Sequence, residues 1–295
     1  MSESSRPDRL ILAAFLLVVL LGGSNSVAIR YSNQELAPFW GAALRFVFAA
    51  AAFWIILWWR KLPLPNLKDS SIIALNGFLT IGISFALLYW GLLKVPVSLA
   101  TIVIATSPLF TFLLAVLHRI ESFRIQALVG GGVALIGMAI AVNAQPGGVE
   151  LLPSLLALAA GALVAAEGNV IFKIYSLKAD SVVINALSIS SGALFLLGTS
   201  LIAGNAWVLP STPQVWAALT YLILGGSVVM FYLFVYVLSR WTASATSYAV
   251  LFFPLVATLL ASWLVKETVT PLFLAGATIV IAGVWIGAFF GTSGA

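Results

Sequence analysis

Cysteine is absent from this 295-residue sequence, and histidine occurs once, at His118. These absences exclude disulfides, thiolate metal sites, cysteine nucleophiles and histidine-rich metal clusters. Charged residues make up only 8% of the chain, whereas a soluble domain carries about a quarter. Hydrophobic residues account for 62%. Because this composition cannot form a water-facing surface, we expect an all-α polytopic membrane protein.

Signatures of catalysis are missing as well. The sequence contains no HExxH, no GxSxG and no paired carboxylates, and its glycines at 130–132 lack the strand and the Lys-Ser/Thr of a phosphate loop. We therefore expect no enzyme activity, no cofactor and no metal. The net charge is +5, but the basic residues lie between apolar runs, so nucleic acid is not an expected partner. The expected partners are the lipid bilayer and a small-molecule substrate, with a monomer as the functional unit and a dimer as the alternative.

Ten apolar runs are long enough to cross a bilayer, because a spanning helix needs about 20 apolar residues. They cover residues 9–29, 36–59, 70–92, 96–117, 122–143, 150–172, 181–203, 214–237, 241–263 and 269–290. We interpret the first run as a span, and a cleaved signal peptide is the alternative. With the N-terminus in the cytoplasm, ten Lys and Arg residues lie on that side and three on the outer side. This bias predicts both termini in the cytoplasm of a bacterial-type inner membrane.

The two halves of the chain repeat each other. Pro108 and Pro254 are 146 residues apart. The same offset pairs Ser98 with Ser244, Glu121 with Glu267, Gly130 with Gly276, and Gly137 with Gly283. We therefore expect two five-helix repeats, at 1–145 and 146–295. Because five is odd, the second repeat enters the membrane from the opposite side, and the repeats are inverted.

Inverted repeats with interrupted helices point to a transporter whose site lies near the membrane midplane. Pro108 and Pro254 lie inside spans, where a proline removes a backbone hydrogen bond and kinks the helix. We interpret the two prolines as hinges for gating, and static packing kinks are the alternative. Thr106 and Ser107 are candidates to bond the carbonyl that Pro108 leaves free.

Four stretches of sequence carry a resemblance to a known family. They are "GGSNSVAIR", "APFWGAALRFVFAA", "LLKVPVSLATIVIATSPLFTFLLAVLHRIES" and "SRWTASATSYAVLFFPLVATLLASWLVKET". Over residues 10–290 the chain resembles the EamA-type permeases of the drug/metabolite transporter superfamily. The resemblance implies a secondary transporter, usually an exporter of small metabolites. Within the family, the chain looks like the YddG-type exporters of aromatic and other neutral amino acids.

The chain departs from the family pattern in one respect. Other residues replace the glycine-containing turn usual before the glutamates of both repeats. We therefore interpret Glu121 and Glu267 as helix-boundary residues and not as substrate ligands. The glycines at 130–132 and at Gly137 let helices approach closely, which predicts tight packing between spans four and five.

Polar side chains inside spans usually face the bundle interior or a water-filled cavity. Arg45 is a candidate to hold a substrate carboxylate, while a tie to backbone carbonyls or to Glu167, or snorkelling, is the alternative. Glu167 is either a ligand for an ammonium group or a proton, or an interfacial residue near the cytoplasm. Asn25 and Asn169 occupy equivalent places in spans one and six, which predicts a shared role, such as interhelical hydrogen bonding.

The remaining cavity candidates are Tyr89, Tyr232, Ser244 and Tyr248. A phenol offers both a stacking face and a hydrogen bond, although core packing is the alternative for each tyrosine. The sequence thus predicts an exporter of small metabolites, above all neutral and aromatic amino acids, working by alternating access through a central cavity. The alternatives are an exporter of drugs or other metabolites, such as nucleosides or cations, and a passive channel.

Overall fold

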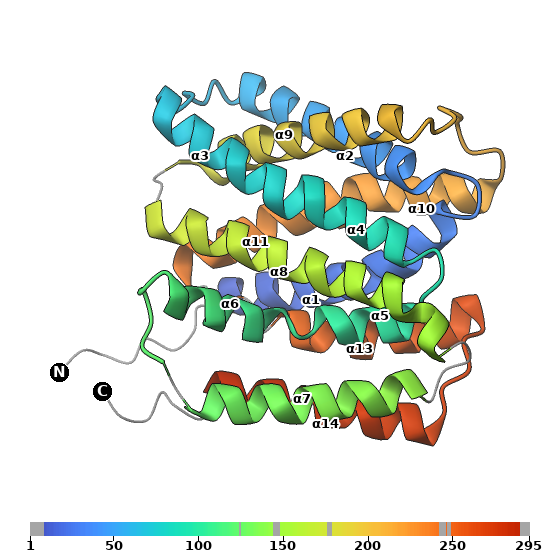
Figure 1. The fold of residues 1–295 in the computed structure, drawn as a ribbon. Helices are drawn as coiled ribbons and strands as arrows, with labels where there is room; N and C mark the ends of the chain where they lie inside the picture. The colour runs from blue at the N-terminus through green and yellow to red at the C-terminus, as the bar shows by residue number, and fades with distance from the viewer. Residues whose placement is uncertain are drawn as a thin grey trace.

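The computed structural model describes residues 9–123, 125–143, 148–175, 179–241, 246 and 249–289. Every regular element within these residues is helical. The helices run along a common direction, and α1 begins where α14 ends, at the left of Figure 1. We call this side of the molecule the terminal end and the opposite side the far end.

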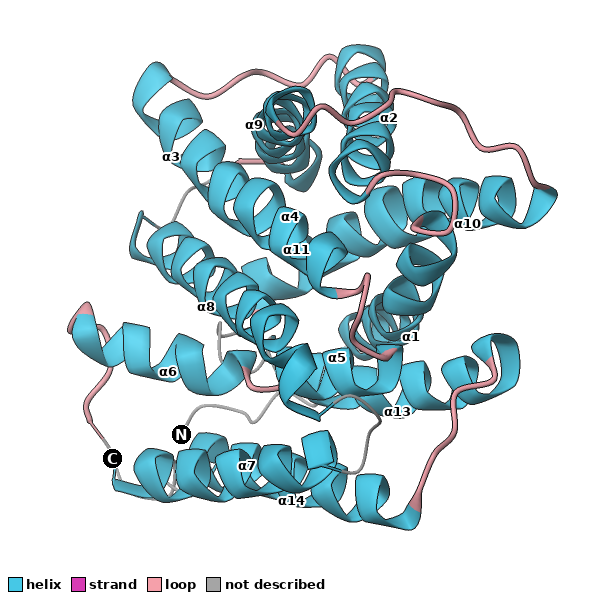
Figure 2. Ribbon diagram, turned by 45° about the vertical axis from the view of Figure 1, so that its right-hand side comes forward, coloured by secondary structure: helices cyan, strands magenta, loops and turns pink. Residues whose placement is uncertain are grey.

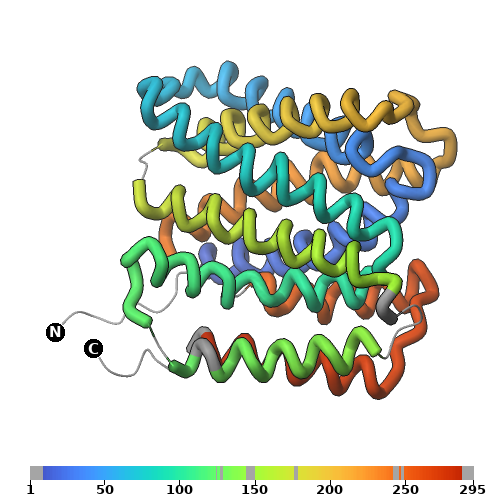
Figure 3. Tube along the Cα trace, in the orientation of Figure 1, coloured from blue at the N-terminus to red at the C-terminus, as the bar shows by residue number. Residues whose placement is uncertain are grey.

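The elements follow one another without long connections, as the trace in Figure 3 shows. The first half contains α1 (Arg9–Ser32), α2 (Pro38–Trp59), α3 (Leu67–Gly77), η1 (Phe78–Ile83), α4 (Ser84–Gly91), α5 (Val97–Ile104), α6 (Ser107–Leu117) and α7 (Ile125–Asn143). The second half contains η2 (Gly148–Leu151), α8 (Leu152–Tyr175), α9 (Ser181–Ile202), α10 (Pro213–Ile223), η3 (Leu224–Val229), α11 (Met230–Arg240), α13 (Ala249–Leu260), η4 (Ala261–Val265) and α14 (Pro271–Phe289). Segments η1, η3 and η4 are π-helical, and η2 is a 3₁₀ turn.

Seven helical stretches in the described part of the chain are long and apolar enough to cross a membrane, counting consecutive elements as one. They are Arg9–Ser32, Pro38–Trp59, Leu67–Gly91, Val97–Leu117, Leu152–Tyr175, Ser181–Ile202 and Pro213–Arg240. Shorter apolar helices, Val129–Asn143, Ala249–Val265 and Pro271–Gly287, lie within the other expected spans. Many large apolar side chains are exposed, which suits a surface that faces lipid. The chain is therefore a polytopic membrane protein.

Helices α7 and α14 form a pair at one side of the bundle, at the bottom of Figures 1 and 2, and α2 packs against α9 near the top. A Cβ atom on Gly130 would lie 2.4 Å from the carbonyl oxygen of Gly283. A Cβ on Gly137 would lie 2.8 Å from the carbonyl oxygen of Gly276. The predicted packing of these glycines between spans four and five is therefore wrong, because their open face is turned toward α14.

The two proline-containing segments differ in structure. Helix α5 ends at Ile104 and α6 begins at Ser107, so Pro108 lies in the first turn of α6. The Ser107 hydroxyl donates a 2.6 Å hydrogen bond to the carbonyl of Ile104, the group that lacks a donor because Pro108 has no N–H. Pro254 lies inside α13, where the two preceding residues are phenylalanines without a hydroxyl. Among the described residues, the helix break that side-chain hydroxyls complete therefore lies in the first half.

Candidate functional site

A cavity of about 220 Å³ lies among helices of both halves. In α9, α11 and α13 the lining residues fall at 184–188, 230–238 and 250–253. Each of these ranges belongs to the part of its transmembrane stretch nearer the terminal end. On these helices the cavity extends from the middle of the bundle toward the terminal end, whereas Leu88 near the end of α4 and Leu158 near the start of α8 line it closer to the far end.

The cavity wall is amphipathic. Its polar side chains are Asn25, Ser26, Asn76, Thr80, Ser84, Ser107, Thr111, Asn169, Asn185 and Ser188. Helices α11 and α13 contribute only apolar side chains, namely Met230, Phe231, Phe234, Val235, Leu238, Val250 and Phe253. A molecule with one polar and one apolar part matches this division.

Five lining residues of α4, α5 and α6 each have a lining partner 146 positions later, the offset between Pro108 and Pro254. They are Ser84 with Met230, Phe85 with Phe231, Leu88 with Phe234, Ile104 with Val250, and Ser107 with Phe253. In two of these pairs a serine of the first half corresponds to an apolar residue of the second. Part of the amphipathic character thus arises where equivalent positions of the two halves differ.

Two π-helical segments flank the cavity and obey the same offset, because each boundary of η3 lies 146 residues after that of η1. A π-helical turn disturbs the regular ladder and leaves a carbonyl able to accept from side chains. The Gly226 carbonyl in η3 accepts from Arg45 Nη2 at 2.7 Å and from Asn25 Nδ2 at 3.2 Å. Glycine leaves room there for the Asn25 amide, since a Cβ would lie 2.0 Å from Asn25 Oδ1. The π turn therefore joins two polar side chains of the first half to the second half.

Arg45 is completely buried behind the cavity wall and is not one of the lining residues. Its Nε atom donates to Ser227 Oγ at 2.7 Å. Its guanidinium carbon lies 4.8 Å and 5.1 Å from the ring centroids of Phe46 and Phe85, and Phe85 lines the cavity. Its Nη1 atom has no hydrogen-bond partner among the described residues. Arg45 therefore joins two helices through a backbone carbonyl, which was the alternative interpretation of this residue, and its side chain does not face the cavity.

The structure brings Asn25 and Asn169 to the same cavity, as expected for equivalent positions. Asn25 Oδ1 is buried and has no hydrogen-bond partner among the described residues. Glu167 is not one of the lining residues, and its Oε1 atom lies 2.8 Å from Nε2 of His118, the residue that follows α6. Both side chains are part-exposed near the terminal end. This position corresponds to the interfacial interpretation of Glu167.

The predicted tyrosines do not line the cavity in the described part of the chain. Tyr89 is fully buried, and Tyr232 packs against the core while its neighbour Phe231 faces the cavity. Ser244 and Tyr248 lie outside the described residues.

Sequence analysis also missed several lining residues. Asn76, Thr80 and Ser84 recur every four residues, a spacing that places them on one helix face and was available as a signal. Phe85 and Phe231, whose ring centroids are 6.0 Å apart, share the 146-residue offset. Applying the repeat offset to aromatic residues would have selected them.

The far end is closed by hydrogen bonds between the two halves. The Glu267 carboxylate accepts from the backbone N–H groups of Val97, at 2.6 Å, and Ser98, at 3.1 Å. It also accepts from the Ser98 hydroxyl at 2.8 Å. These groups lie at the start of α5, where a carboxylate satisfies free N–H groups and interacts favourably with the helix dipole. The prediction that Glu267 is a helix-boundary residue is confirmed.

A second carboxylate closes the far end beside it. Glu35, in the α1–α2 connection, accepts from the N–H groups of Ser211, at 2.6 Å, and Thr212, at 3.2 Å, and from the Thr212 hydroxyl. The bond from the Thr212 hydroxyl is the main cause that lowers the pKa of Glu35, followed by the Ser211 N–H. Tyr31 adds a 2.8 Å hydrogen bond to the carbonyl of Leu264.

The sequence profile of the EamA-like transporter family matches residues 9–143 and 152–288, which together make up most of the chain. The chain belongs to the EamA-like transporter family. Among similar proteins, the "Probable amino-acid metabolite efflux pump" of Salmonella typhimurium strain LT2 is 28% identical over 93% of both chains. The "Uncharacterized inner membrane transporter YedA" of Escherichia coli K12 is 27% identical over 94% of this chain and 90% of its own.

Two further similar proteins also align over more than nine-tenths of both chains. The "Probable terminal-alkyne amino-acid exporter" of Streptantibioticus cattleyicolor is 26% identical over 92% of this chain and 91% of its own. A solved crystal structure aligns with a TM-score of 0.70 over 96% of this chain and 97% of that one, at 19% identity. That structure shows the shared fold alone.

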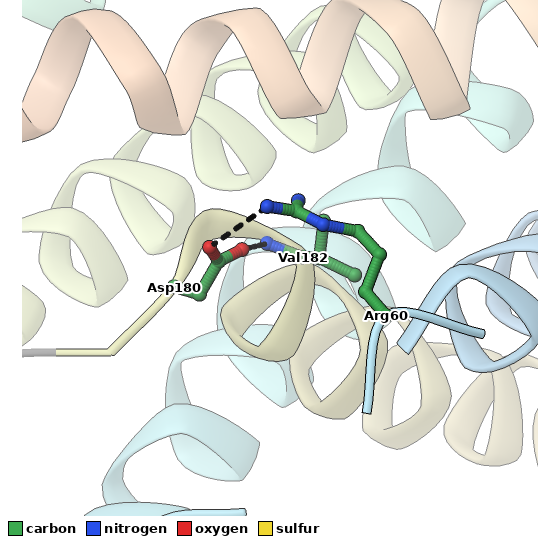
Figure 4. A network of polar contacts seen from close by, with 3 residues as sticks. All are labelled: Arg60, Asp180 and Val182. Atoms are coloured by element: carbon green, nitrogen blue, oxygen red, sulfur yellow. Dashed lines mark hydrogen bonds and ion pairs between the residues drawn. The ribbon is translucent and has the colours of Figure 1, made fainter. Parts of the chain in front are cut away.

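At the terminal end, the halves of this EamA-like transporter are joined by contacts that are weaker in geometry. Arg60 at the end of α2 pairs with Asp180 at 3.9 Å, and both side chains are exposed (Figure 4). Asp180 also accepts from the N–H of Val182 at 2.8 Å and so caps α9. His118 and Glu167 also join the halves at this end, so among the described residues the far end differs in having two carboxylates that accept from backbone N–H groups.

Proposed function

We propose that this EamA-like protein is a secondary exporter in the bacterial inner membrane, and that it moves neutral and aromatic amino acids and closely related metabolites. The amphipathic cavity supports a substrate with a polar and an apolar part. The names of similar proteins, an amino-acid metabolite efflux pump and an amino-acid exporter, support the same class. One of the similar proteins is named an inner membrane transporter, which supports the location.

The proposed architecture is ten transmembrane helices in two inverted repeats, residues 1–145 and 146–295, with both termini in the cytoplasm. Three observations support it. The family profile matches each half separately. The π-helical segments η1 and η3 share the offset found in the sequence. Helices α1 and α14 begin and end at the same side, which the charge bias assigns to the cytoplasm.

The proposed mechanism is alternating access. The observation that carries it is the cavity, which extends toward the terminal end while Glu267 and Glu35 bond the far end shut. In this state the substrate enters from the cytoplasm. Release requires the bonds of Glu267 and Glu35 to break while the terminal end closes, and the break at Pro108 allows α6 to move relative to α5.

Counterflow in proteoliposomes tests the function. Vesicles loaded with unlabelled phenylalanine are expected to accumulate labelled phenylalanine transiently and saturably, because a carrier exchanges substrate across the membrane. A channel gives no such accumulation. Absence of counterflow for every amino acid in a panel, with folded protein confirmed, contradicts the proposal.

Topology is tested separately. Because the chain has no cysteine, single cysteines at Lys61 and Lys94 report sidedness without background. An impermeant thiol reagent is expected to label them from opposite faces of the membrane. Labelling of both from one face contradicts the proposed arrangement.

A further inference from the structure

Within the part of the chain that the structure describes, the cavity wall contains no group that would neutralise a cation. Among the lining residues, all of which the structure describes, none is Asp, Glu, Lys, Arg or His. The polar wall offers only amide and hydroxyl groups, and the wall formed by α11 and α13 is apolar. A cationic substrate that enters the cavity therefore loses its hydration and meets no negative charge among these lining residues.

A buried positive charge, that of Arg45, lies behind the wall and contacts the lining residue Phe85. Arg45 is fully buried, and the ion pairs within the described residues, Arg60–Asp180 and His118–Glu167, do not involve it. Its interactions are with a carbonyl, a hydroxyl and two aromatic rings, none of which carries a net charge. A charge without a counter-ion in a low-dielectric interior acts over longer distances than one in water.

Two contacts connect the positive charge of Arg45 with residues of the cavity wall. Phe85 lies between the guanidinium and the cavity, with its ring centroid 5.1 Å from the guanidinium carbon. Asn25, also in the wall, donates to the same Gly226 carbonyl as Arg45. The region around Phe85 and Asn25 is thus the electropositive part of a wall whose described residues carry no charge.

We infer that the cavity selects its substrates by charge: it accepts amphipathic molecules that are anionic, neutral or zwitterionic, and it rejects molecules with a net positive charge. Arg45 is the residue that determines this specificity, acting through the wall rather than by contact. The inference rests on the proposed transport site, and it narrows the alternatives by removing cationic drugs from the substrate range. The carboxylate end of a bound amino acid is expected to face Asn25 and Phe85.

Binding of a matched set of ligands to the purified full-length protein tests the inference without any transport step. The three probes share a phenylalkyl body and differ in charge: 3-phenylpropanoate, 3-phenylpropanamide and (2-phenylethyl)trimethylammonium. Thermal stabilisation measured over a concentration series gives each dissociation constant. Sodium chloride and tetramethylammonium chloride at equal ionic strength control for salt and for the cationic head group alone.

The expected result is that the anion and the amide bind at least tenfold more tightly than the cation. Equal or tighter binding of the cation overturns the inference. Absence of binding by all three probes overturns it as well, since the inference requires the cavity to take a phenylalkyl body. Neither outcome decides the transport proposal, because phenylalanine counterflow is measured independently.

Variants at Arg45 assign the source of the selectivity. Arg45→Met is expected to lower the ratio of anion to cation affinity at least tenfold, whereas Arg45→Lys is expected to keep the ratio within threefold of wild type. Lys94→Met removes one positive charge from an exposed position and is expected to leave the ratio unchanged. An unchanged ratio in folded Arg45→Met assigns the selectivity elsewhere and refutes the role of Arg45. If Arg45→Met does not fold, the wild-type panel still decides the charge preference and Arg45→Lys still tests the position.

Discussion

The far end and the terminal end of the bundle are joined by different chemistry. At the far end, Glu267 makes three short hydrogen bonds to the start of α5, in a part-buried position. Hydrogen bonds that involve an ionised group contribute about 1.5–3 kcal/mol each. At the terminal end, the exposed Arg60–Asp180 pair is separated by 3.9 Å, and such pairs contribute about 0–1 kcal/mol. With the part-exposed His118–Glu167 contact included, the described contacts that join the halves are still more numerous at the far end, where Glu267 and Glu35 both accept from backbone N–H groups.

The difference also shows how a duplicated chain can favour one state. Two identical inverted repeats would close either end equally well, because each contact at one end would have an equivalent at the other. Arg45 ties α2 to η3, but α9 begins and ends 143 residues after α2, and the position 143 residues after Arg45 is Ser188, which is too short to make the same tie. The Ser107 hydroxyl beside the helix break has Phe253 as its equivalent. Under the proposed alternating-access mechanism, divergence at such positions would bias the equilibrium between the two states.

The largest effect is expected for Glu267→Gln. The substitution keeps the side chain's shape but removes the charge that α5 stabilises, so the far end should open more often. A loss of about 1.5–3 kcal/mol corresponds to at least a tenfold increase in the open population. The measurement is the rate at which an impermeant maleimide, added on the far side, labels a single cysteine placed at Leu88 in the cavity wall.

Glu150→Gln is the matched control for this experiment. Glu150 is an exposed carboxylate in η2, also at the far end, and no hydrogen bond of its side chain is present among the described residues. The same substitution there is expected to leave the labelling rate unchanged. Equal labelling rates for Glu267→Gln and wild type would show that this carboxylate does not hold the far end closed.

A smaller effect is expected for Arg30→Met. The Nη1 atom of Arg30 donates to the carbonyls of Leu92 and Leu93, at 2.6 Å and 2.9 Å, where the helix containing α4 ends. A cation at a helix C-terminus contributes about 0.3–1 kcal/mol, so labelling of the Leu88 cysteine should rise by about two- to fivefold. Arg30→Lys should restore most of the wild-type rate. A tenfold or larger rise would mean that Arg30 matters as much as Glu267 and that the ranking of contacts is wrong.

Helix positions in this protein could be predicted well from sequence for a physical reason. Lipid offers backbone groups no hydrogen bonds, so an apolar run of sufficient length has to form a helix. The expected spans at 181–203 and 150–172 agree with Ser181–Ile202 and Leu152–Tyr175. The partner of each helix was harder to predict, as the glycines of α7 show. A glycine face indicates close packing but does not identify the neighbour.

The cavity could be predicted only in part. Because a charge is costly in lipid, Arg45 was correctly predicted to face the bundle interior. The same reasoning does not distinguish a side chain in the cavity wall from one directly behind the wall. Asn25 and Asn169 were found because the repeat gives a second, independent constraint. The tyrosines were chosen because a phenol can bind a substrate. That property does not show which face of its helix a residue occupies, and so it did not reveal that Phe231 faces the cavity while Tyr232 packs against the core. The repeat offset was therefore a better guide than residue type.

At the terminal end, Glu167→Gln is expected to have a still smaller effect. Its partner His118 is part-exposed, and a part-exposed pair contributes about 0–1 kcal/mol, so counterflow should stay within about twofold of wild type between pH 5 and pH 8. His118→Gln should behave in the same way. If transport by wild type depends on pH in this range and the dependence disappears in Glu167→Gln, the residue carries a coupling proton and the terminal end has a larger role than proposed.

The smallest effect concerns acidification of the far end through Glu35. Because hydrogen bonds hold the pKa of Glu35 below its ordinary value of 4.5, its contribution to closure is fully present above 4.5 and is lost as the pH falls through the lowered pKa. Hydrogen exchange at the Ser211 and Thr212 amides, corrected for the intrinsic pH dependence, should thus be constant from pH 7 to pH 5 and rise only at pH values below 4.5. Thr212→Val removes the main cause of the lowered pKa, so the rise should begin at a higher pH.

The Glu35→Gln variant separates this carboxylate from the other acids of the molecule. With no titrating group at position 35, exchange at the two amides should be faster than in wild type at pH 7 and should show no further rise on acidification. A rise at low pH that persists in Glu35→Gln would place the acid-sensitive contact elsewhere, and Glu267 would then be the next carboxylate to test, because it closes the same end of the bundle. The two variants together thus divide the pH response of the far end between its two capping carboxylates.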